Sequence, residues 1–202
     1  MRIGIDFDNT IVSYDALFHR VARDLALIPA DTPPTKLAVR DHLRRIGRED
    51  DWTEMQGTVY GARMDEALAF PGVIEFLRRA GAHGHVPAVI SHKTRHPFIG
   101  PPHDLHAAAR GWIDHHLGRG AGALVAPERV FFELTKEDKI GRIAAFDCDV
   151  FIDDLPEILL APGFPATTRR ILFDPERHHV PGDYPQFEVA QSWADVHRYL
   201  DL

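Results

Sequence analysis

The stretch Ile3-Gly4-Ile5-Asp6-Phe7-Asp8-Asn9-Thr10 leads an apolar run directly into two aspartates spaced two residues apart. Alternate residues of an extended chain point to the same side, so Asp6 and Asp8 would project together from the end of a buried strand. This spacing fits a solvated strand end as well as a chemical site. A chemical site can be distinguished from a solvated strand end only if other strands bring further polar groups to the same edge of the sheet.

Short apolar runs recur along the chain and alternate with segments of helical spacing. Residues 72–81 carry apolar side chains on one helical face and end on glycine, and residues 135–145 begin with a capping-box-like threonine. Strands that alternate with helices predict an α/β fold with a Rossmann-like, mainly parallel sheet flanked by helices. The predicted strands cover residues 2–6, 86–91, 130–133, 150–153 and 170–173.

The region between residues 13 and 69 breaks this alternation, because it contains no convincing strand. Apolar residues at helical spacing, such as Leu17 and Val21, instead predict several short helices. We therefore predict a small helical cap, residues 13–69, inserted after the first strand. Residues 1–12 and 70–202 would form the α/β core.

Composition narrows the class of protein. The chain has 202 residues, of which 45% are hydrophobic, so it can bury a substantial core. Its net charge of −7, without a basic stripe, argues against a nucleic-acid or membrane-surface partner. The single cysteine excludes an internal disulfide, and no stretch resembles a signal peptide or membrane span. We predict a cytoplasmic protein with a small-molecule partner; the oligomeric state is left open.

Polar residues follow three of the predicted strands. Ligands of parallel α/β sheets bind beyond the carboxyl ends of the strands. Carboxylates about 4 Å apart repel one another by roughly 4 kcal/mol at an effective dielectric constant near 20, so a cation is expected among them. Oxygen ligands suit Mg²⁺, particularly where a phosphate completes the coordination. The residues brought to this edge would be Asp6, Asp8, Ser91, Asp153 and Asp154.

Lysine is rare in this sequence, and two of its four lysines begin the helix that precedes the Asp153-Asp154 strand. Lys136 and Lys139 are about one helical turn apart, so either could face the site. A lysine ammonium is suited to bridging a carboxylate and a phosphoryl oxygen.

In this order, Asp6-Phe-Asp8-Asn-Thr10, Ser91, a helix-start lysine and Asp153-Asp154 resemble the four motifs of the haloacid dehalogenase (HAD) superfamily. The resemblance spans essentially the whole chain and implies a phosphatase-type member with a helical C1-type cap. It implies a Mg²⁺-dependent phosphomonoesterase, a hydrolase of a small phosphorylated metabolite. Members that cleave carbon–halogen bonds generally lack the second aspartate, so Asp8 indicates a phosphate ester as substrate.

The resemblance also implies residue roles. Asp6 would be the nucleophile that forms an aspartyl-phosphate, and Asp8 the general acid and base. Mg²⁺ would be held by Asp6, the backbone carbonyl of Asp8 and the diacid, with Asp154 favoured over Asp153 as the direct ligand. Lys139, with Lys136 as the alternative, would neutralise charge on the phosphoryl group. Substrate contacts are predicted for Thr10, Ser91, His92, Lys93 and Arg95.

Several alternatives share these motifs. A nucleoside 5′-monophosphate phosphatase or a phosphomutase would keep all of them. A receiver-like phospho-signalling module also combines a Mg²⁺ site, a phosphorylated aspartate and a lysine, but the long insertion after the first strand argues against it. A binding module with a degenerate site is disfavoured because every motif position is filled.

Overall fold

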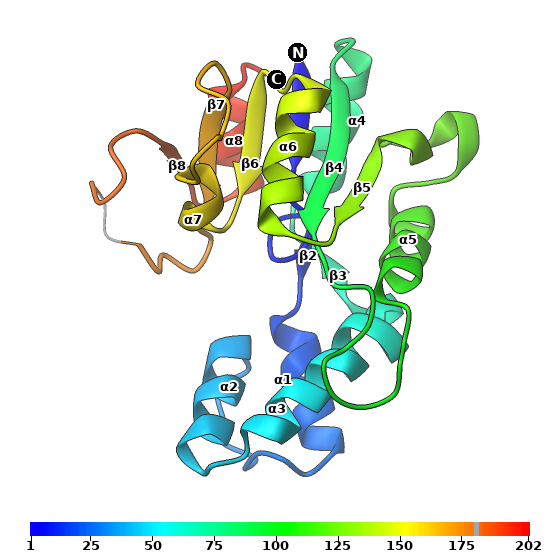
Figure 1. Ribbon diagram of the computed structural model, residues 1–202, viewed down its shortest axis with the longest axis vertical. Coiled ribbons are helices and arrows are strands. Elements are labelled where there is room, and N and C mark those ends of the chain that lie inside the picture. Colours follow the sequence, from blue (N-terminus) through cyan, green and yellow to red (C-terminus); the bar gives the residue numbers. More distant parts are fainter. Residues whose placement is uncertain (180–181) are drawn as a thin grey trace. The chain divides into compact units, whose positions relative to one another are not determined.

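The computed structural model describes residues 1–179 and 182–202 (Figure 1). Contacts within the chain divide it into two compact units, each assembled from separate segments. We call the first the core unit and the second the helical unit. The core unit comprises Met1–Val12, Ala69–His92 and Leu117–Leu202, and the helical unit comprises Ser13–Leu68 and Lys93–His116.

The core unit is built on a six-stranded sheet with strand order β5-β4-β1-β6-β7-β8, in which every pair is parallel. This confirms the predicted α/β fold and adds one short strand, β8. From the central β1 the chain fills one side with β4 and β5 and the other with β6, β7 and β8, so the strand order reverses at β1. The strands are β1 (Arg2–Ile5), β4 (Val86–His92), β5 (Val130–Glu133), β6 (Val150–Asp153), β7 (Arg169–Phe173) and β8 (Glu188–Ala190).

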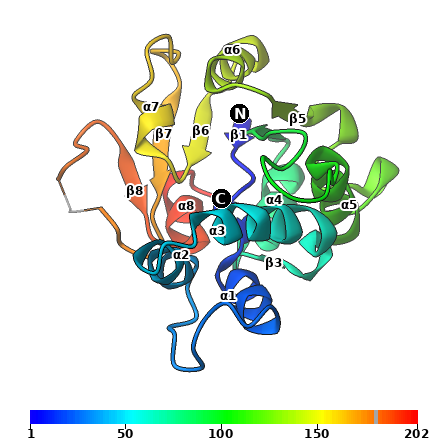
Figure 2. The same ribbon diagram turned by 60° about the horizontal axis from the view of Figure 1, so that its bottom comes forward.

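Helices cover both faces of this sheet. Figures 1 and 2 show α6 (Lys136–Phe146) and α7 (Pro156–Leu159) over one face, and α4 (Val73–Ala82) and α8 (Trp193–Tyr199) over the other. Apolar side chains of α6 and α7 pack with those of β4, β6 and β7 into a buried cluster. The burial of this apolar area on both faces is the main stabilising contribution to the core unit.

The helical unit contains α1 (Asp15–Asp24), α2 (Lys36–Arg45), α3 (Glu49–Gly57) and α5 (Leu105–His116). The helices α1, α2 and α3 confirm the predicted helical insertion after β1. Four aromatic rings pack in its interior with centroids 4.8 to 6.4 Å apart, those of Tyr14, Phe18, Trp52 and Tyr60. Two short strands, β2 (Val12–Ser13) and β3 (Leu68–Ala69), pair where the chain enters and leaves the insertion. Over the described residues, none of the helices has both the length and the apolar character of a membrane span.

Residues 93–116 differ from the sequence-based division, which placed them in the core. In the structure they group with the helical unit. Gly57 and Gly61 explain how, because a Cβ at Gly57 would lie 2.8 Å from Pro97 and one at Gly61 would lie 2.6 Å from His103. Because neither glycine has a side chain, residues 93–116 can pack closely on the end of α3 and on the helical turn that follows it. Trp112 adds a hydrogen bond from its indole Nε1 to the Ala67 carbonyl, at 2.8 Å.

Candidate active site

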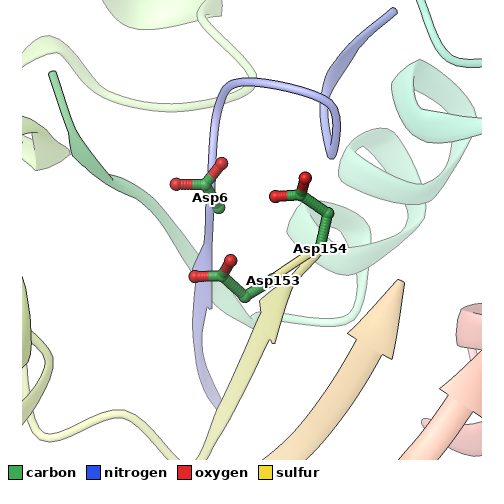
Figure 3. Close-up of side chains that lie close together, drawn as sticks. All are labelled: Asp6, Asp153 and Asp154. Atoms are coloured by element: carbon green, nitrogen blue, oxygen red, sulfur yellow. The ribbon is translucent and has the colours of Figure 1, made fainter. Parts of the chain in front are cut away.

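Three carboxylates meet where β1 and β6 end side by side (Figure 3). Asp6 follows β1, and its amide donates to the Ile152 carbonyl at 2.9 Å, which extends the pairing with β6 by one residue. Asp153 is the last residue of β6 and Asp154 follows it. One oxygen from each carboxylate lies within 4.8 Å of the others. The parallel pairing of these two strands is what brings residues so distant in sequence together.

Lys139 lies inside this acidic cluster. Its ammonium donates to Asp6 Oδ1 and to Asp153 Oδ2, both at 2.6 Å, and the residue is 1% exposed. Lys136, one turn earlier on α6, is exposed and pairs with Glu157. The structure thus brings Lys139, and not Lys136, together with the carboxylates.

The charges of the cluster shift the protonation of its members. Burial raises the pKa of the Asp6 carboxyl to about 7; Lys139 opposes the rise, whereas Asp153 and Asp8 add to it. Burial by itself lowers the pKa of Lys139, but the attraction of Asp153 and Asp6 outweighs burial and raises that pKa, so the ammonium stays charged. Two buried carboxylates therefore share one ammonium, and a divalent cation would favour the charged form of Asp6.

Ser91 and Thr10 flank the same position. Ser91 lies in β4 next to β1, and its buried hydroxyl donates to Asp6 Oδ1 at 2.8 Å. Thr10 is fully buried, and its Oγ1 has no hydrogen-bond partner in the described part of the chain. Its carbonyl accepts from Trp193 Nε1 at 3.2 Å, which ties the loop after β1 to α8. Asp8 is half-buried in this loop, and its charge reaches Asp6.

The remaining predicted substrate contacts divide between the two units. His92 ends β4, with Nε2 3.1 Å from the Leu134 carbonyl oxygen, and burial lowers the pKa of its imidazole. Lys93 and Arg95 belong to the helical unit. There the Lys93 ammonium lies 4.8 Å from the centre of the Tyr60 ring, and Arg95 Nε donates to Asp104 at 3.2 Å. A role for these three residues in binding substrate stays a prediction.

The donor set fits a hard divalent cation, since it consists of carboxylate oxygens. Both oxygens of Asp153 already accept hydrogen bonds, Oδ1 from the Leu155 amide at 2.9 Å and Oδ2 from Lys139. Asp154 Oδ2 accepts from the Asn9 side-chain amide at 3.4 Å, a contact that sequence reasoning did not anticipate. Because Asp153 is already bonded to the Lys139 ammonium, Asp154 is the better suited of the two carboxylates to bind a metal directly.

The raised pKa of Asp6 predicts a specific dependence of stability on pH. A carboxyl that binds its proton more tightly when folded contributes stability that is fully present below its unfolded pKa and is lost as pH rises through about 7. The free energy of unfolding of metal-free wild type, relative to Asp6→Asn, should fall by about 2–3 kcal/mol between pH 5 and pH 8. Urea unfolding of both proteins in EDTA measures this difference. A difference that does not change with pH would contradict the burial of an ionisable Asp6.

Comparisons with known proteins address the fold. Neither a protein-family model nor a curated protein matches the sequence. Among solved structures, the chain is similar to a HAD-family hydrolase from Deinococcus radiodurans R1 with bound phosphate and sodium, at 18% identity and a TM-score of 0.59. That similarity covers 98% of this chain and 94% of the other.

Two further solved structures widen the range of chemistry found on this fold. The HAD-hydrolase YfnB from Bacillus subtilis, bound to magnesium, is 14% identical with a TM-score of 0.53, over 100% of this chain and 98% of that one. The L-2-haloacid dehalogenase RSc1362 is 12% identical with a TM-score of 0.56, over the same shares of the two chains. At these identities the likeness is one of fold.

Proposed function

Because this chain has the fold of the HAD superfamily, we propose that it is a Mg²⁺-dependent phosphomonoesterase acting on a small phosphorylated metabolite. One observation carries the proposal: Ser91 and Lys139 both donate to the same oxygen of Asp6, beside the acidic end of β6. A carboxylate held in one orientation by a hydroxyl and an ammonium is arranged for attack on an electrophile. The same two donors can then bind the oxygens of a phosphoryl group.

The reaction would proceed in two displacements at phosphorus. A carboxylate oxygen of Asp6 forms a bond to phosphorus while the bond between phosphorus and the leaving alcohol oxygen breaks, and Asp8 gives that oxygen its proton. Asp8 then removes a proton from water, whose oxygen attacks phosphorus. The bond between phosphorus and Asp6 breaks, inorganic phosphate leaves, and Asp6 is restored. Lys139 and Ser91 would stabilise the charge on the phosphoryl oxygens in both steps.

Asp6, Asp154 and the backbone carbonyl of Asp8 would hold the magnesium ion, with Asp153 supporting through Lys139. Bound Mg²⁺ would offset the repulsion between this acidic edge and a phosphate dianion.

Asp8 favours a phosphate ester over an organohalide, although both chemistries occur on this fold. A halide leaves as a stable anion and needs no proton, whereas an alkoxide leaves poorly unless an acid protonates it. An aspartate two residues after the nucleophile supplies that acid. The charge of Asp8 contributes to the raised pKa of Asp6, so the two carboxyl groups interact. The same reasoning supports the nucleotidase and phosphomutase alternatives, which also break a phosphate ester.

The proposal is tested by assaying phosphate release from a panel of sugar, polyol and nucleoside monophosphates, with Mg²⁺ or with EDTA. We expect at least one ester to be hydrolysed, and only with Mg²⁺. Halide release from 2-haloacids, measured in parallel, is expected to be absent. Halide release without hydrolysis of any phosphomonoester would overturn the proposal. Activity confined to nucleoside monophosphates would favour the nucleotidase, and an isomerised product without free phosphate would favour the phosphomutase.

Asp8→Asn should slow the enzyme in a way that depends on the leaving group. For an alkyl phosphate the first displacement should slow by about 10²–10⁴-fold, because the alkoxide is no longer protonated. For p-nitrophenyl phosphate the loss in that step should be much smaller, since nitrophenolate leaves without a proton. Single-turnover measurements of alcohol or nitrophenol release isolate the first step. Equal losses for both substrates would assign Asp8 a role other than the acid.

A further inference from the structure

Asn9 stands out in the loop after β1 because its backbone is left-handed, with φ of 57°. Glycine adopts this conformation freely, and asparagine is one of the few other residues that tolerate it. The turn around it is closed at the Phe7 carbonyl, which accepts from the amides of Ile11 at 3.1 Å and Val12 at 3.0 Å. Together with the bond from Trp193 to the Thr10 carbonyl, these contacts fix where the Asn9 side chain begins.

From this fixed turn, the Asn9 amide donates to Asp154 Oδ2 at 3.4 Å. Asp153 is bonded to the Lys139 ammonium, which offsets its charge, whereas Asn9 offers Asp154 a neutral donor that orients the carboxylate without neutralising it. A carboxylate held in one orientation is what a hard cation requires.

We propose that Asn9 is a positioning residue that orients Asp154 for direct coordination of Mg²⁺ and thereby raises the affinity of the site for the ion. This inference rests on the proposed function, because it assumes that the acidic cluster binds Mg²⁺. Glycine at this position would satisfy the backbone equally well. The side chain of asparagine therefore adds the amide donor and nothing that the turn itself needs.

The test compares Mg²⁺ affinity, measured by calorimetry without substrate, in wild type and Asn9→Gly. This variant removes the amide and keeps a residue suited to positive φ. We expect Asn9→Gly to bind Mg²⁺ about tenfold more weakly, as is typical when the partner of a metal ligand is removed. Asp147→Gly is the matched control, because Asp147 has φ of 56° at the end of α6 and takes no part in the cluster. It likewise introduces glycine in place of a polar residue in the same backbone conformation, and should leave the affinity unchanged.

Two further measurements separate positioning from a general structural effect. Asn9→Gly in an Asp154→Asn background should weaken Mg²⁺ binding no further, because its partner is already altered. In the phosphate-release assay, Asn9→Gly should need about tenfold more Mg²⁺ for half-maximal rate and recover the wild-type rate at saturation. A variant that is merely destabilised would not need more Mg²⁺ for half-maximal rate and yet recover the wild-type rate at saturation.

The outcomes distinguish the two proposals. If wild type binds Mg²⁺ and Asn9→Gly binds it equally tightly, the role of Asn9 is refuted while the proposed function stands. If wild type binds no Mg²⁺, both fail. If both single variants weaken binding but their effects add fully in the double variant, Asn9 acts independently of Asp154 and the inference is wrong.

Discussion

Replacing Lys139 with methionine is expected to lower the free energy of unfolding of the metal-free protein by about 3–5 kcal/mol at pH 8. The loss follows from burial: the Lys139 ammonium is enclosed with Asp6 and Asp153, and its removal leaves two carboxylates in a low-dielectric interior without a cation. Methionine keeps most of the volume and the apolar contact near the Phe151 ring, which lies 5.5 Å from the ammonium. The predicted loss is therefore electrostatic and not a packing defect.

Lys136→Met is the matched control for this measurement. It makes the same substitution one turn earlier on α6, where the side chain is 48% exposed and pairs with Glu157 at the surface. An exposed pair of this kind contributes about 0–1 kcal/mol. Urea unfolding in EDTA compares the two variants directly. Similar small losses for both would contradict a buried, charged Lys139, and a larger loss for Lys136→Met would reverse the assignment of the catalytic lysine.

Replacing Asp6 with asparagine is expected to reduce phosphate release by about 10⁴-fold or more, the scale seen when a catalytic nucleophile is removed. An amide cannot form the aspartyl-phosphate that the first displacement requires. Acid-quenched wild type turning over a substrate labelled with ³²P should carry label that hydroxylamine removes, and Asp6→Asn should carry none. Full activity in the variant, or label retained on it, would refute the role of Asp6.

Asp149→Asn is the matched control for Asp6→Asn. Asp149 immediately precedes β6, at the opposite end of that strand from Asp153, and its Oδ2 accepts from the Arg2 amide at 2.7 Å. The same change of residue type is thus made away from the acidic cluster. Its activity should stay within severalfold of wild type. At pH 8, Asp6→Asn should also be at least as stable as metal-free wild type, so its inactivity cannot come from unfolding.

The strands were predictable because local signals repeat in each of them. An apolar run followed by acids marks both β1 and β6. The carboxyl ends of parallel strands lie at the same edge of the sheet, so the acids of both strands are expected there. The rotation of α6 was not predictable. Lys136 and Lys139 share one helical face by spacing, and only the packing of α6 on the sheet decides which ammonium is enclosed.

The features that escaped sequence reasoning depend on partners far away in the chain. Asn9 carries no local sign of its contact, because Asp154 lies 145 residues later. Strand β8 has three residues and exists through its pairing with β7 at the sheet edge. The signal that could have drawn attention to Asn9 is its residue type in a tight turn, where glycine is the usual alternative.

The close packing of residues 93–116 on Gly57 and Gly61 bears on how this protein could be taken apart or recombined. An insertion confined to one stretch can be excised or exchanged between relatives as a cassette. Here the helical unit also contains a second stretch, residues 93–116. A deletion of residues 13–69 would therefore remove the surfaces on which Pro97, His103 and Trp112 pack. That second stretch begins at Lys93, two residues after Ser91. A chimaera that exchanges the helical unit must therefore carry both stretches, and the second stretch has to be joined within two residues of Ser91.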